Sequence, residues 1–168
     1  MEIVDLLIRW VHVIAAVVWI GGNLTMAMVI VPYFRRSVSP VERIKILTQI
    51  GKGFEPIVWG CVLVLIFSGI YNIFGAIGVG APDSLGPFMR TLSVKLVLVL
   101  ILIVLTGIHS FIMGPRIAQA IDTLEPDVEQ LPQEIDKMRS QMAIVSSLIG
   151  VVSLLVLLAA VALRLGLG

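Results

Sequence analysis

Charged side chains are scarce in this chain of 168 residues. Only 14% of the residues are Asp, Glu, Lys or Arg, whereas 58% are hydrophobic. Soluble domains usually carry about 25% charged residues, so the deficit excludes a water-facing surface around a chain of this size. The mean hydropathy is +1.06. We therefore expect a single domain, residues 1–168, embedded in a lipid bilayer.

Cysteine and a strong net charge are lacking as well. The single cysteine, Cys61, excludes an internal disulfide. The formal net charge of +1 provides no basic stripe to neutralise phosphates, which excludes a nucleic-acid partner. No phosphate-cradling glycine loop or zinc signature occurs, so nucleotide or hydrolytic chemistry is not expected. Glu2 and Asp5 stand where a signal peptide has basic residues, and we expect the first apolar segment to be retained.

Long charge-free runs are what the chain does have. They are Trp10–Phe34, Pro56–Pro82, Leu96–Pro115 and Ser140–Leu163. Each reaches the roughly 20 residues that cross the hydrocarbon core, and continuous apolar runs favour helices over a barrel. The sequence thus predicts an all-α, integral membrane four-helix bundle, with spans at about 8–34, 56–78, 92–114 and 140–164. We find no internal repeat.

The segments between the runs predict the orientation. A capping-box pattern at Ser39–Glu42 predicts a short interfacial helix at 40–50, and an acidic loop follows at 116–139. Basic residues are concentrated in the two long loops: Arg35, Arg36, Arg43, Lys45, Lys52, Arg116, Lys137 and Arg139. The positive-inside rule then places both loops in the cytoplasm and both termini on the non-cytoplasmic side. We expect a prokaryotic cytoplasmic membrane.

Polar residues inside the runs recur at helical spacing. Residues 7, 11 and 14 apart lie within about 40° of one another on a helix. Three runs carry such a stripe: His12, Trp19, Asn23 and Met26; Cys61, Ser68, Asn72 and Gly75; Lys95, Leu102, Thr106 and His109. The fourth run offers only small residues, Ser146, Gly150 and Ser153. Because polar groups that face lipid are costly, we expect three inward stripes and a fourth helix that acts as a wall.

Depth separates these residues into two candidate sites. His12 and Lys95 lie near the outer ends of parallel spans, whereas His109 lies roughly 20 Å deeper at 1.5 Å per residue. The two histidines are therefore not expected to ligate one iron from opposite sides. The outer candidate site comprises His12, Lys95, Asn72, Tyr71, Arg9 and Arg90. The inner candidate site comprises His109, Cys61 and Met26.

Three motifs, in order, resemble those of a known superfamily. They are RWVHVIAAVVWIGGNLTMAMVIVP with His12 and Trp19, FSGIYNIF at 67–74, and SVKLVLVLILIVLTGIHSF with Lys95. Together they resemble the copper-resistance protein D (CopD) domain and its relative, the HemJ-type protoporphyrinogen oxidase. The resemblance implies a membrane-embedded metal or tetrapyrrole site that uses His12 and Lys95. It departs from HemJ-type proteins at His109, which lies further behind the lysine than their histidine does.

Three hypotheses for function remain open. In the first, His12 is an axial ligand of haem b or a porphyrin, Arg9, Arg90 or Lys95 neutralises propionates, and the protein transfers electrons or oxidises a porphyrinogen. An enzymatic activity would then be that of an oxidoreductase. In the second, the protein handles copper, since imidazole and sulfur ligands such as His109, Cys61 and Met26 select Cu(I). In the third, it is a non-catalytic subunit of a larger complex, with other membrane redox subunits or a second copy as partners.

Overall fold

The computed structural model describes residues 2–78, 85–124 and 131–165. All regular elements in these ranges are helices. They are α1 (Glu2–Thr25), η1 (Met26–Ile30), α2 (Val31–Ser37), α3 (Pro40–Gly78), α4 (Leu85–Gly107), η2 (Ile108–Met113), α5 (Gly114–Asp122) and α6 (Gln133–Arg164). Four helical stretches are long and apolar enough to cross a membrane: Glu2–Ser37, Pro40–Gly75, Phe88–Asp122 and Gln133–Arg164. The predicted all-α membrane fold is confirmed.

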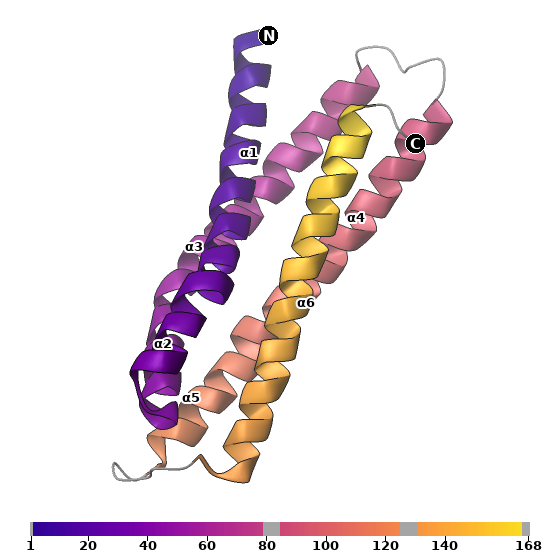
Figure 1. The fold of residues 1–168 in the computed structure, drawn as a ribbon. Helices are drawn as coiled ribbons and strands as arrows, with labels where there is room; N and C mark the ends of the chain where they lie inside the picture. The colour runs from indigo at the N-terminus through magenta and orange to yellow at the C-terminus, as the bar shows by residue number, and fades with distance from the viewer. Residues whose placement is uncertain (1, 79–84, 125–130, 166–168) are drawn as a thin grey trace.

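The four long stretches form two antiparallel hairpins, α1 with α3 and α4 with α6 (Figure 1). The described ends of the chain lie at one end of the bundle, which we call the terminal end. At the opposite end, called the loop end, α2 leads into α3 and α5 is followed by α6. Residues 40–50, expected to form a separate helix, are the first turns of α3. The predicted cap is present, because Ser39 Oγ accepts a hydrogen bond from the backbone N–H of Glu42 at 3.3 Å.

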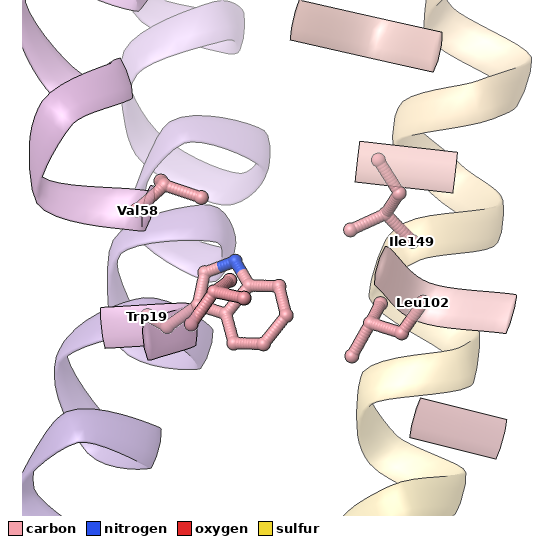
Figure 2. Close-up of a cluster of buried hydrophobic side chains, with 5 residues drawn as sticks. Trp19, Val58, Leu102 and Ile149 are labelled. Atoms are coloured by element: carbon pink, nitrogen blue, oxygen red, sulfur yellow. The ribbon is translucent and has the colours of Figure 1, made fainter. Parts of the chain in front are cut away.

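Packing between the hairpins is apolar at mid-height. One buried cluster joins all four long helices through Trp19, Val58, Val62, Leu102 and Ile149. Figure 2 shows the Trp19 ring lying between its own hairpin and the Leu102 and Ile149 side chains of the other. A second cluster, Ile44, Ile117, Ile121 and Ile135, packs α5 against α3 and α6. The mid-height cluster therefore fixes how the two hairpins, and the polar residues near it, face one another.

A close contact sets the spacing within the first hairpin. A Cβ added to Gly22 would collide with the Phe54 ring, whereas one added to Gly21 would meet nothing within 4 Å. Phe54 therefore occupies the space over Gly22, and a larger residue at that position would force the Phe54 ring to move.

The first and third spans share an irregularity that the sequence analysis did not predict. Each contains a π-helical segment, η1 or η2, that ends two residues before a proline. The backbone N–H of Val31 reaches Met26 and that of Gly114 reaches His109, one residue further back than in an α-helix. Pro32 and Pro115 follow, and a proline ring clashes with the carbonyl four residues earlier unless the helix widens.

The positions before these prolines correspond in the two spans. His12 precedes Pro32 by the same number of residues as Lys95 precedes Pro115. The same holds for Trp19 and Leu102, which meet in the mid-height cluster. Although their sequences share few identities, the first and third spans are thus built alike. His12 and Lys95 occupy equivalent positions in them.

Candidate functional site

His12 is half-buried on α1 and faces α3. Its Nδ1 atom lies 2.7 Å from the hydroxyl oxygen of Ser68. The Ser68 hydroxyl in turn donates to the carbonyl of Val64 on its own helix. Because a hydroxyl has one proton, Ser68 accepts from His12, and Nδ1 is the nitrogen that donates.

This hydrogen bond fixes the chemistry of the imidazole. A neutral imidazole with its proton on Nδ1 has its lone pair on Nε2. Metal-binding histidines in proteins are held in this way, with one ring nitrogen donating to an oxygen and the other free to coordinate. Gly69 borders the ring, since a Cβ placed there would lie 3.5 Å from His12 Cε1. The residue beside the imidazole thus has no side chain to crowd it.

Lys95, half-buried on α4, brings a positive charge to the same level. It is close enough to His12 for the two groups to interact electrostatically. Within the described ranges the only ion pair joins Arg139 to Asp136, at the loop end, so no carboxylate of those ranges neutralises Lys95. An uncompensated ammonium inside a bundle attracts an anionic group such as a carboxylate.

The other residues of the outer candidate site lie apart from the imidazole. The exposed Tyr71 donates its hydroxyl proton to Asp5 Oδ1 at 2.7 Å, which ties α3 to the first turns of α1. Arg9 and Arg90 are exposed, and Asn72 is half-buried on α3. The structure thus joins His12 to Ser68, with Lys95 within electrostatic range of His12, and it gives Tyr71 a hydrogen bond between helices.

His109 has a similar but looser partner. It lies in η2, and its Nδ1 atom is 3.4 Å from the hydroxyl oxygen of Ser146 on α6. The Ser146 hydroxyl donates to the carbonyl of Met142 at 2.9 Å. The fourth helix is therefore more than a wall, because it supplies this serine.

The residues of the inner candidate site come from three different helical segments. Cys61 packs against the mid-height cluster, and Met26 is half-buried in η1. In the part of the chain that the structure describes, no three His, Cys, Asp or Glu side chains gather closely enough to hold a metal ion.

A comparison with protein-family models identifies a family for this chain. The model described as copper resistance protein D matches residues 48–163, which is more than half of the chain. The chain belongs to this family. Searches among curated proteins and solved structures found no match. The CopD match contains Ser68, Lys95 and His109 and begins after His12.

Sequence reasoning missed the hydrogen-bond partners of two candidate residues, His12 and Tyr71. Ser68 was placed on an inward stripe but was not proposed as a partner of His12, and Asp5 was noticed only for its charge. The signal for Ser68 was its position on that stripe, because a hydroxyl that faces inward must meet another helix. Nothing in the spacing indicates Asp5, since residues 5 and 71 meet only through the packing of α1 on α3.

Proposed function

We propose that this CopD-family membrane protein binds haem b, or a related porphyrin, near the terminal end of the bundle. His12 Nε2 is the axial ligand, and Lys95 attracts a propionate. The protein then serves in electron transfer or in porphyrin redox chemistry. The observation that supports this most is the 2.7 Å hydrogen bond from His12 Nδ1 to Ser68, which leaves Nε2 available.

The donor set fits a haem-type group better than a resident copper ion. A haem iron is held by its macrocycle and needs one protein imidazole as proximal ligand. A copper site needs several protein ligands, and the described residues around His12 offer one imidazole and one ammonium. Lys95 would repel a cation, whereas it complements the carboxylates of a tetrapyrrole. When bound, the haem supplies the redox centre, and the chain supplies its ligand, its orientation and its charge environment.

An absorption spectrum tests the proposal. The protein would be purified in detergent on a tag that contains no histidine, from cells supplied with a haem precursor. We expect a Soret band, and reconstitution of pigment-free protein with haemin should restore it at one equivalent. A protein that stays colourless, and that binds haemin no better than an unrelated four-helix membrane protein, would refute the proposal.

Copper handling is the second candidate, and the family match favours it. Copper would then be cargo that passes through the protein, with His12 as a first contact and His109, Cys61 and Met26 as later ones. Metal analysis after loading with Cu(I) separates this from haem binding. Retained copper that is lost in Cys61→Ala would support the copper hypothesis, and equal retention in both proteins would refute this role of Cys61.

We further propose that both termini lie on the non-cytoplasmic side of a prokaryotic cytoplasmic membrane. The basic residues of the loop end support this orientation through the positive-inside rule. Reporter enzymes that are active on only one side of the membrane, fused after Arg164, would test it. Activity of the cytoplasmic reporter at this position would reverse the assignment.

A further inference from the structure

Four buried polar atoms near mid-height have no hydrogen-bond partner in the described parts of the chain. They are Trp19 Nε1, Asn23 Nδ2, Trp59 Nε1 and Thr106 Oγ1. Trp19 and Thr106 are each only 5% exposed. All four atoms carry hydrogen and can donate, and the three nitrogens can only donate.

These atoms come from three helices and lie at nearly one level. Trp19 and Leu102 belong to the mid-height cluster (Figure 2). Asn23 lies one turn beyond Trp19 on α1, and Thr106 lies one turn beyond Leu102 on α4. Since α1 and α4 run in the same direction, Asn23 and Thr106 occupy equivalent positions towards the loop end. The donors therefore belong to both hairpins.

Thr106 stands out among the buried hydroxyls. Among the residues that the structure describes, the buried polar side chains are Ser68, Thr106 and Ser153. Ser68 and Ser153 each donate to the carbonyl four residues back on their own helix. Thr106 does not, although the same type of acceptor exists on any helix. The Thr106 hydroxyl can thus donate a hydrogen bond to some other acceptor.

Neither lipid nor a carboxylate of the charge-free runs offers that acceptor. Hydrocarbon cannot accept hydrogen bonds, so buried donors at this depth must be satisfied from inside the bundle. The charge-free runs Trp10–Phe34, Pro56–Pro82, Leu96–Pro115 and Ser140–Leu163 hold no Asp or Glu. Three of the four unpaired atoms are N–H groups, which favours a ligand with lone pairs and disfavours a metal cation.

We propose that the middle of the bundle contains a binding site for a small hydrogen-bond acceptor that bridges Asn23 and Thr106, with Trp19 Nε1 as a third donor. Ordered water and a small inorganic anion such as chloride share this chemistry. The site is distinct from the one proposed at His12, which lies two turns of α1, about 10 Å, from Trp19. Bound there, the acceptor joins the two hairpins where their packing is otherwise apolar.

The sign of a stability change tests this proposal. Thr106→Val and Asn23→Leu replace the donors with apolar groups of similar size. Removing a truly unpaired buried polar group raises stability, whereas removing one that binds a ligand lowers it. We expect each variant, in lipid nanodiscs, to lower Tm by about 2–4 °C. Because both donate to one acceptor, the double variant should lower Tm by less than the sum of the two shifts. A raised Tm, or additive losses, would overturn the proposal.

A control and a second measurement complete the test. Ser153→Ala removes a buried hydroxyl that is paired within its own helix, so its effect on Tm should add to that of Thr106→Val. Replacing chloride with gluconate distinguishes the occupants: a Tm that falls in the wild type but not in Thr106→Val identifies an anion. If Tm does not respond, radiolytic labelling in ¹⁸O-water should mark buried Trp19 in the wild type. If neither the Tm nor the labelling responds, the site is empty and the proposal fails.

Discussion

The two histidines of the chain are held alike, and the comparison shows what distinguishes a ligand site from packing. His12 Nδ1 lies 2.7 Å from Ser68, whereas His109 Nδ1 lies 3.4 Å from Ser146. Both serine hydroxyls donate within their own helices. A histidine–serine pair between helices is thus a recurrent way to keep an imidazole in a bundle. His12 differs by its shorter hydrogen bond, by Lys95 nearby and by Gly69 beside its ring.

Removing each imidazole in turn gives the largest expected difference. His12→Ala should abolish the Soret band of the purified protein, because it removes the proposed axial ligand. His109→Ala should retain the band at wild-type intensity per protein. Absorption spectra of the two variants, with circular dichroism to check folding, make this measurement. Equal loss in both variants would remove the distinction between the histidines.

The serine partners of the two histidines should differ in their effect on haem affinity. Ser68→Ala removes the acceptor that orients His12, and loss of such an outer partner typically weakens metal binding about 10–100-fold. Ser146→Ala removes the equivalent partner of His109 and should leave haem affinity unchanged. Haemin titrations of the pigment-free variants measure both effects. An unchanged affinity in Ser68→Ala would show that the hydrogen bond has only a packing role.

The ammonium group of Lys95 should have a weaker effect on haem affinity than Ser68 does. Lys95→Gln removes the charge that attracts a propionate, and we expect a loss of about 1 kcal/mol, or about fivefold in affinity. Lys137→Gln at the loop end is the matched control, because it removes the same charge away from His12. The same titrations, repeated at high salt, should narrow the gap between the two variants. A Lys95→Gln variant that binds haemin as the wild type does would leave Lys95 without this role.

The smallest effect on the cofactor is expected from the packing of the hairpin that carries His12. Gly22→Ala places a Cβ against Phe54 and should lower the free energy of unfolding by about 1–3 kcal/mol, with a minor loss of haem affinity. Gly21→Ala meets nothing within 4 Å and should change neither. Thermal unfolding in detergent provides the test. Similar stabilities of the two variants would contradict the close contact.

Much of the fold follows from the sequence because each span is set by its own composition. Runs without charge predicted four membrane helices, and the structure has four of suitable length. The helix cap at Ser39 could also be predicted from the sequence, since it depends on two residues three positions apart. The π-helical segments were not predicted, although Pro32 and Pro115 were visible. The reason is that a proline can kink, break or widen a helix, and packing decides which outcome occurs.

The candidate site was predicted less well because it depends on contacts between helices. Periodicity placed His12 and Ser68 on inward stripes, but it carries no information on how α1 and α3 are rotated about their axes. The Ser68 partner and the Asp5–Tyr71 hydrogen bond therefore emerged only from the packing. The equivalence of His12 and Lys95 was present in their spacing from the two prolines. It was overlooked because corresponding positions carry different residue types.

The central claim, that His12 coordinates a haem iron through Nε2, is tested most directly in a chain whose only histidine is His12. The chain contains two histidines, so His109→Ala leaves His12 alone. Pulsed electron paramagnetic resonance of the ferric His109→Ala protein, grown with ¹⁵N-histidine and purified without a histidine tag, detects a histidine nitrogen bound to iron. We predict one strongly coupled ¹⁵N nucleus. A haem-containing protein without such a coupling would contradict the account.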